Sequence, residues 1–158
     1  MEQTIDKPIR SYRDHAREYG MKVLKSFVKD TEFVQGRRRF FKYRDLGVTA
    51  ASNGRMRANI VTSIEGTLES TGWHYHECDM QFVYIIKGEV GIEFEDGTVA
   101  TFGPGDTMFI PGGTVHNEVY LSDDKESLEV SIPAKMGTVN VERPKHLPEK
   151  LTPLSNKL

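Results

Sequence analysis

Three histidines have the residue type and the spacing of a metal site. His74 and His76 are two residues apart. Because side chains alternate between the faces of a β-strand, these two imidazoles would point the same way from Cα atoms about 6.5 Å apart. A third histidine, His116, follows the turn-forming residues Pro111 and Gly113. Imidazole is a good ligand for divalent transition metals, so the three rings are predicted to converge on one ion.

The alternative interpretation is that these histidines are core or surface residues that bind no metal. We expect this for His15 and His146, which lie outside the pattern. It is a weaker explanation for three histidines grouped around tight turns. Cys78, the single cysteine of the chain, has no ligand-like spacing and is expected to be a loop thiol.

The elements that must position these histidines are short strands. Residues 55–65 and 89–95 alternate between apolar and polar side chains, which predicts strands with one buried face. Residues 81–87 are apolar on both faces. Further strands are predicted at 71–77, 99–102, 107–110, 116–121 and 128–132, separated by turns rich in glycine and proline. Many short strands and almost no helix predict an all-β sandwich or barrel.

The flanking segments are less regular. Residues 1–54 are predicted to form an N-terminal extension, with a short helix at 11–19 capped by Ser11, an edge strand within 33–46 and a loop at 48–54. The run of arginines at 37–39 is expected to be solvated, with an anion-binding patch as the alternative. Residues 55–133 form the predicted barrel. Residues 134–158, a tail that contains prolines, are expected to pack on the barrel or on a partner subunit.

The composition narrows the possible environments and partners. The chain has 158 residues, of which 37% are hydrophobic and 28% charged, as in a globular domain. A net charge of -2 gives no drive toward nucleic acid or an anionic membrane. No apolar stretch approaches the roughly 20 residues of a membrane helix, and the N-terminus does not read as a signal peptide. The single cysteine suits a reducing compartment, so a cytoplasmic location is expected.

Residues 55–133 resemble the cupin superfamily through two spaced motifs. The first motif, HxH followed by an acidic residue and a glycine, matches His74, His76, Gln81 and Gly88. The second, which contains G, PxG, H and N, matches Gly105, Pro111, Gly113 and His116, with Tyr120 at the asparagine position. Gln81 replaces the glutamate of the family, and Leu68 stands where a glycine is expected.

This resemblance implies a small jelly-roll barrel, also called a double-stranded β-helix. It implies one divalent metal ion per chain, which could be Zn, Fe, Ni or Mn, with His74, His76, His116 and Gln81 as ligands. A glutamine carbonyl is neutral, so such a centre would keep the full charge of the ion. It would be a stronger Lewis acid and would favour an anionic ligand such as a carboxylate or enolate. Alternatively, Gln81 stays unligated and forms a hydrogen bond at the site.

Tyr120, four residues after His116, is expected to share its face. It is a candidate general acid, with a barrel-lining role as the alternative. The leading functional hypothesis is a metal-dependent lyase, isomerase or cyclase that acts on a small oxygenated molecule. The alternatives are an Fe(II)-dependent dioxygenase and a non-catalytic barrel that binds a small ligand. A homodimer is expected to cover an outward apolar face formed by Trp73, Tyr75, Phe82, Tyr84 and Ile86.

Overall fold

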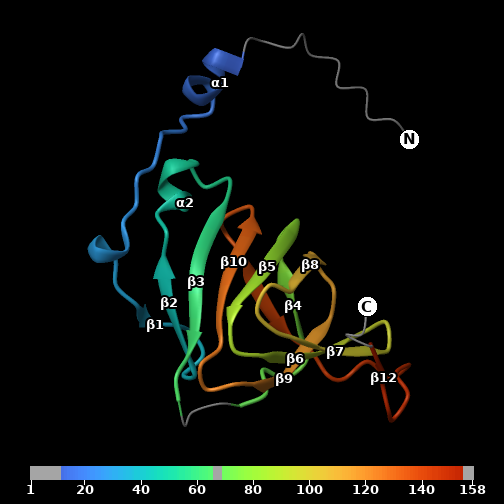
Figure 1. The fold of residues 1–158 in the computed structure, drawn as a ribbon. Coiled ribbons are helices and arrows are strands. Elements are labelled where there is room, and N and C mark those ends of the chain that lie inside the picture. Colours follow the sequence, from blue (N-terminus) through green and yellow to red (C-terminus); the bar gives the residue numbers. More distant parts are fainter. Residues whose placement is uncertain (1–11, 66–68, 155–158) are drawn as a thin grey trace, which may run out of the picture.

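The computed structural model describes residues 12–65 and 69–154, which form two six-stranded sheets facing each other as a barrel (Figure 1). The strands are β1 (Val34–Gln35), β2 (Phe41–Asp45), β3 (Arg57–Ser63), β4 (His74–Glu77), β5 (Met80–Lys87), β6 (Val90–Phe94), β7 (Thr98–Phe102), β8 (Thr107–Pro111), β9 (His116–Leu121), β10 (Glu126–Ile132), β11 (Gly137–Asn140) and β12 (Thr152–Pro153). The all-β jelly-roll prediction is confirmed.

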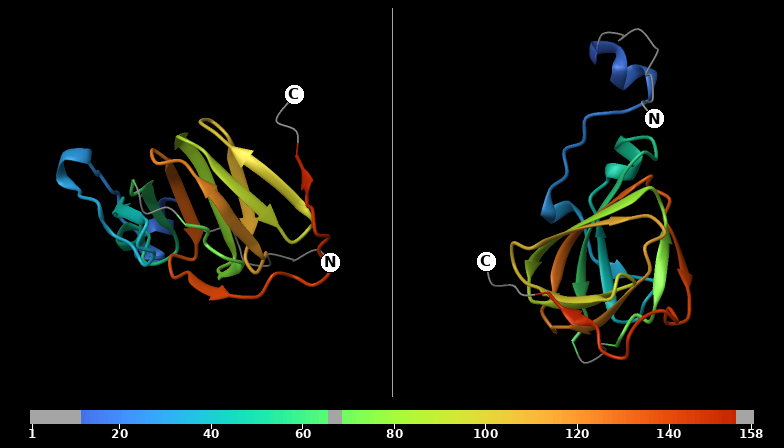
Figure 2. Two further views of the ribbon diagram at one scale, coloured as in Figure 1. Left: turned by 90° about the horizontal axis from the view of Figure 1, so that it is seen from below. Right: turned by 90° about the vertical axis from the view of Figure 1, so that its right-hand side faces the viewer.

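Each sheet combines strands from distant parts of the chain. One has the strand order β1-β2-β3-β10-β5-β8, and the other has the order β11-β4-β9-β6-β7-β12. Figure 2 shows them closing around a shared interior. The consecutive strands β4 and β5 lie in different sheets and do not pair. They therefore do not form an antiparallel hairpin, and the space between the sheets brings their inward side chains together.

The helices are short and peripheral. Helix α1 (Tyr12–Glu18) confirms the predicted N-terminal helix, whereas its proposed cap, Ser11, lies outside the described residues. Figure 1 shows α1 standing away from the barrel. Helix α2 (Val48–Ala51) replaces the loop predicted at 48–54, and a 3-10 turn, η1, spans Val28–Asp30. No helix within the described residues is long and apolar enough to cross a membrane.

Residues 34–45 form a hairpin instead of a single edge strand. β1 pairs with β2, and β2 continues into the sheet by pairing with β3. Phe40 and Phe41 are only 3% and 4% exposed and belong to the core. The arginines at 37–39 occupy the turn between the two strands. This turn is therefore anchored to the interior by the aromatic residues that follow it.

Strand β3 presents its polar residues to the barrel interior. Arg57 and Asn59 line the internal cavity, and Val61 is completely buried in the core. Ala58 and Ile60 are also buried, on the opposite face. The alternation between 55 and 65 was thus sufficient to predict a strand. It does not reveal which face is inward, because a barrel with a polar cavity reverses the usual assignment.

The core packs between the sheets and leaves a cavity. Its buried members are Phe40, Phe41, Val61, Val83, Ile85, Val90, Ile92, Met108, Ile110 and Leu121. Phe109 is 62% exposed on the outer face of β8. The tail extends the second sheet, since β11 pairs with β4 and β12 pairs in parallel with β7.

Candidate metal centre

The three predicted histidines meet between β4 and β9. His74 and His116 are direct partners in the antiparallel pairing of these strands. His76 lies two residues further along β4, on the same face. One ring nitrogen from each histidine lies within 4.8 Å of the others. The ring centroids are 4.4 Å apart for His74 and His116, and 5.0 Å apart for His74 and His76. The three rings thus surround a common point where they could hold a single ion.

Hydrogen bonds fix the orientation of each ring through its Nδ1 atom. His74 Nδ1 lies 2.8 Å from the carbonyl oxygen of Gly72, and His116 Nδ1 lies 2.9 Å from that of Thr114. His76 Nδ1 lies 3.1 Å from the hydroxyl of Thr138 in β11. When Nδ1 carries the proton and donates it to these oxygens, Nε2 keeps a free electron pair. In this arrangement Nε2 is the atom of each ring that remains available to a metal.

The site keeps its imidazoles neutral. Burial lowers the pKa of His74 to about 4 and that of His76 to about 3, and it also lowers the pKa of His116. The neighbouring imidazoles add to the lowering for His74 and His76, because two protonated rings at this distance would repel each other. A neutral imidazole is the form that binds a metal.

Gln81 supplies an unsatisfied oxygen to the same interior. Its side chain is 6% exposed and lines the cavity with the three histidines. Its Oε1 atom is buried without a hydrogen-bond partner among the described residues. A buried carbonyl oxygen without a partner costs free energy unless a donor or a cation satisfies it. Three Nε2 atoms and this oxygen thus form a donor set that fits a divalent transition metal.

The cavity next to the histidines has a volume of 540 Å³ and two unlike walls. The apolar wall comes from β5, β6 and β8 and consists of Val83, Ile85, Val90, Ile92, Met108 and Ile110. The other is rich in charged and polar side chains, among them Arg37, Arg38, Tyr43, Asp45, Arg57, Asn59, Glu118, Lys125 and Glu129. A small molecule inside would therefore meet the histidines together with one apolar and one polar surface.

Tyr120 lies outside this cavity. It is 51% exposed, because β9 is irregular: Ile92 pairs with Glu118, whereas the adjacent Gly91 pairs with Tyr120. The register shift places an extra residue, Val119, in β9 and moves Tyr120 to the outer face. The expectation that Tyr120 shares the face of His116 is therefore wrong. Glu118, two residues after His116, lines the cavity instead, and burial raises the pKa of its carboxyl group.

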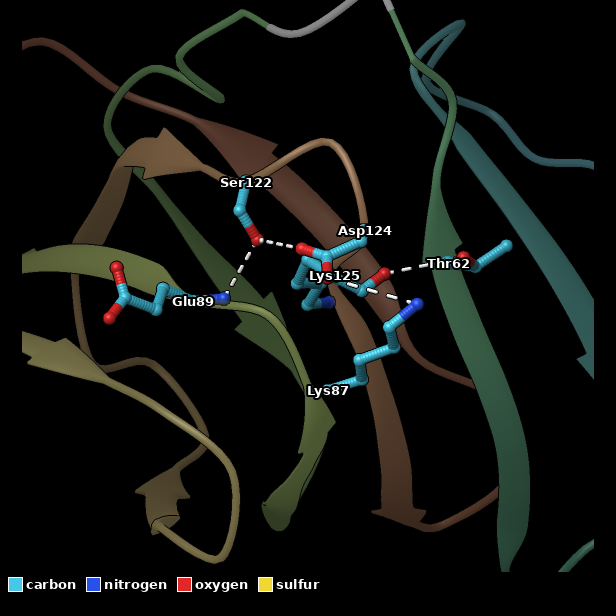
Figure 3. A network of polar contacts seen from close by, with 6 residues as sticks. All are labelled: Thr62, Lys87, Glu89, Ser122, Asp124 and Lys125. Atoms are coloured by element: carbon cyan, nitrogen blue, oxygen red, sulfur yellow. Dashed lines mark hydrogen bonds and ion pairs between the residues drawn. The ribbon is translucent and has the colours of Figure 1, made fainter.

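Lys125 enters the cavity from the loop between β9 and β10. Its side chain is 2% exposed, and its Nζ lies 3.7 Å from Glu129 Oε1 and 5.1 Å from the ring centroid of Phe41. The loop is held as Figure 3 shows: Ser122 Oγ accepts a hydrogen bond from the backbone N–H of Glu89 and donates one to Asp124. The carbonyl of Lys125 accepts a bond from the hydroxyl of Thr62.

Sequence reasoning missed most of the polar wall. Glu118 could have been found from its spacing of two residues from His116. The run of arginines at 37–39 predicted a solvated surface, with an anion-binding patch as the alternative, and did not single out Arg38. Lys125 lies in a loop with no distinguishing local pattern, so only the packing of this loop against the barrel reveals it.

Sequence comparison finds the same region of the chain. Residues 60–130 match the sequence model of the Cupin domain family. A stretch of 44 residues is 36% identical to the uncharacterized protein YdbB of Bacillus subtilis (strain 168). This stretch covers 28% of the chain and 39% of the length of YdbB.

Several solved structures share the fold. The polyketide cyclase RemF from Streptomyces resistomycificus is 23% identical with a TM-score of 0.62, over 78% of this chain and 89% of that chain. KdgF from Halomonas sp. is 21% identical with a TM-score of 0.59, over 71% and 96% of the two chains. Streptomyces Pac13, a nucleoside dehydratase, is 13% identical with a TM-score of 0.53, over 77% and 95%. Residues 60–130, which contain both motifs, thus match the Cupin domain family, and the chain shares the jelly-roll fold of these structures.

Proposed function

We propose that this cupin is a metal-dependent enzyme that performs lyase, isomerase or cyclase chemistry on a small oxygenated molecule. The observation that carries the proposal is the convergence of His74, His76 and His116, each with its Nδ1 engaged and its Nε2 free. The similarity in fold to a polyketide cyclase and to a nucleoside dehydratase supports this class of chemistry. Another Pac13 structure contains uridine, which supports a small-molecule ligand.

In this proposal, His74, His76 and His116 hold the ion, and Gln81 provides a neutral fourth oxygen. A divalent ion bound there supplies Lewis-acid polarisation of a substrate oxygen. The apolar wall of Val83, Ile85, Val90, Ile92, Met108 and Ile110 excludes water from one side of the substrate. The polar wall on the other side orients its hydrogen-bonding groups.

The test of the metal site is elemental analysis of protein purified without added metal. About one ion per chain is expected for the wild type, and His76→Ala should lose most of it. His146→Ala is the matched control, because His146 is exposed and contacts the carbonyl of Glu95 at the surface. Full metal retention by His76→Ala would refute the assignment of the ligands.

The same preparation separates this proposal from its two alternatives. Activity with zinc, without consumption of oxygen, supports the Lewis-acid reaction. Oxygen consumption that requires added Fe(II) supports a dioxygenase instead. Tight binding of a small ligand without turnover supports a barrel that only binds. A screen of sugar acids, nucleosides and polyketide-like enols, followed by mass spectrometry of the products, distinguishes these outcomes.

We also propose that the protein is a cytoplasmic homodimer. The outer face of β5 and β8 exposes a contiguous set of apolar side chains, namely Met80, Phe82, Tyr84, Ile86 and Phe109. Trp73 and Tyr75, which were expected to extend this face, lie on or beside β4 in the other sheet. Burial of such a face against a second copy removes apolar area from water. The free thiol of Cys78 suits a reducing compartment.

Light scattering tests the dimer. The wild type should have twice the mass of the chain, and Phe109→Glu should shift it toward the monomer, because Phe109 is the most exposed residue of the set. Thr101→Glu, on the outer side of β7, is a control at a strand position away from this face. A wild-type protein that is monomeric at micromolar concentration would contradict the dimer.

A further inference from the structure

The turn between β1 and β2 places an arginine at the polar wall of the cavity. Arg38 lines the cavity, whereas its neighbour Arg39 points outward and pairs with Glu69 at the surface. The Nη2 atom of Arg38 is buried and has no hydrogen-bond partner among residues 12–65 and 69–154. A buried guanidinium N–H without an acceptor is costly, so this atom marks a place where an acceptor is missing.

The backbone around Arg38 is fixed. Its carbonyl accepts hydrogen bonds from the backbone N–H of Phe41, at 3.1 Å, and from Nε2 of Gln35, at 3.0 Å. The N–H of Gly36 closes the hairpin by donating to the carbonyl of Phe41. The following residues, Phe40 and Phe41, are buried in the core. The turn is therefore anchored at both ends, and Arg38 is held over the interior instead of extending freely into solvent.

The charges of the cavity leave room for an anion. The charged lining residues comprise four cations, Arg37, Arg38, Arg57 and Lys125, against three acids, Asp45, Glu118 and Glu129. Lys125 already compensates Glu129 at 3.7 Å. Glu118 attracts Arg38 electrostatically, but no ion pair within 4.0 Å joins Arg38 to a carboxylate in the part of the chain that the structure describes. Among the charged lining residues, the cations therefore outnumber the acids by one.

Arg38 shares its cavity with the histidines. His74, His76 and His116 line the same space as Arg38, so one molecule in the cavity can meet both the guanidinium and the imidazoles. Tyr43 lines the same wall, and burial raises the pKa of its phenol, which therefore remains a hydrogen-bond donor. A guanidinium offers paired N–H donors that match the two oxygens of a carboxylate or phosphate group.

We propose that Arg38 binds an anionic group, a carboxylate or a phosphate, of the molecule that occupies the cavity. The inference rests on the proposed function, because the histidine site would hold another oxygen of the same molecule. Arg38 then selects an anionic substrate over a neutral one of the same size. The run of arginines at 37–39 divides accordingly, since Arg38 serves the cavity and Arg39 forms an ion pair at the surface.

The experiment uses the full chain freed of metal by dialysis, so that an anion cannot bind through the ion. Malonate and inorganic phosphate are the probes, titrated by calorimetry at constant ionic strength. One of them should bind with a stoichiometry of one, and the more tightly bound probe identifies the anionic group. Arg38→Gln should weaken its binding by about 10-fold or more, because a charge-assisted pair is lost. The affinity of Arg38→Lys for the probe should lie between those of the wild type and Arg38→Gln, because lysine keeps the charge without the paired donors.

Arg39→Gln is the matched control, since it removes the same charge one residue away. Its affinity for the probe should stay within about twofold of the wild type, because exposed charges are largely screened by salt. Equal weakening in Arg38→Gln and Arg39→Gln would overturn the proposal, as would saturable binding that Arg38→Gln leaves unchanged or the absence of binding by either probe. Thermal melting verifies that each variant is folded, and Arg38→Lys supplies the comparison if Arg38→Gln is not.

Elemental analysis of the same variants separates this proposal from the proposed function. Arg38→Gln should retain the metal content of the wild type. Arg38-dependent anion binding in a protein that never takes up metal would refute the metal-dependent function and leave the anion site standing. Metal uptake without Arg38-dependent anion binding would refute the anion site alone.

Discussion

The backbone N–H of Gly113 donates a hydrogen bond of 3.0 Å to the carbonyl oxygen of His76. The turn of the second motif is thereby attached directly to a proposed ligand of the first. The adjacent Gly112 donates to the carbonyl of Asp79, also at 3.0 Å, in the turn between β4 and β5. These two bonds hold the β8–β9 turn against the β4–β5 turn, close to the start of the strand that carries His116.

Gly112→Ala should destabilise the fold and weaken the metal site. A Cβ at Gly112 would overlap the backbone carbonyl of Cys78, which cannot move without shifting the turn. We expect a loss of about 2–4 kcal/mol in the free energy of unfolding, as for other backbone clashes in a packed site. Gly103→Ala is the control, since only a distant Asp106 oxygen approaches that position. Urea titration measures the free energy of unfolding of both variants. Equal values would contradict the importance of the close approach between Gly112 and the Cys78 carbonyl.

Thr138→Val should reduce metal affinity without unfolding the barrel. The Thr138 hydroxyl orients His76 through Nδ1, and the loss of such a partner typically weakens metal binding 10- to 100-fold. Thr107→Val, at an exposed position on β8, provides the control. Competition with a chromophoric chelator measures the affinities. A Thr138→Val protein with wild-type affinity would show that β11 does not support the ligand.

Gln81→Glu should tighten metal binding and weaken the binding of anions to the loaded protein. The substitution adds a negative charge to a donor set that is otherwise neutral, so it lowers the net charge of the centre. Gln81→Met keeps the approximate volume and removes the oxygen, and should bind metal less tightly than the wild type. Chelator competition and calorimetry with malonate give the two quantities. Identical metal affinities in all three proteins would place Gln81 outside the coordination sphere.

Acid should destabilise the metal-free protein through its buried histidines. The native pKa of His74 is about 4, below its ordinary value of 6.5, so between these values the unfolded chain binds a proton that the native chain excludes. Stability is therefore lost as the pH falls below 6.5, by about 2 kcal/mol for His74 at pH 5. His74→Asn should lose less stability over this interval. Denaturant titrations at pH 7 and pH 5 measure the difference, and parallel losses in the two proteins would contradict the assignment.

The strand pattern and the histidine cluster could be predicted because both depend on local spacing. The sequence HxH on a strand places two rings on one face, and turns of glycine and proline bring His116 to them. The predicted strand at 116–121 has the observed bounds of β9. The strand boundaries elsewhere differ by one to three residues, as at β7 and β10.

The inward face of β3 and the position of Tyr120 could not be predicted, for two physical reasons. A barrel that encloses a polar cavity turns Arg57 and Asn59 inward, so hydrophobicity alone assigns the wrong face. A bulge changes the phase of a strand without any change in residue type that marks it. Arg38 and Lys125 reach the cavity from turns, where the direction of a side chain depends on packing instead of periodicity.

The extra residue in β9, Val119, decides which later side chains of this strand face the cavity. If the same residues paired regularly, without the bulge at Val119, the acid at 118 and the phenol of Tyr120 would both turn toward the interior, and Leu121 would leave the core. Relatives that differ by one residue at this point could thus carry different proton donors within the same jelly roll. A short insertion or deletion here would be a simple evolutionary route to a new reaction on an unchanged scaffold.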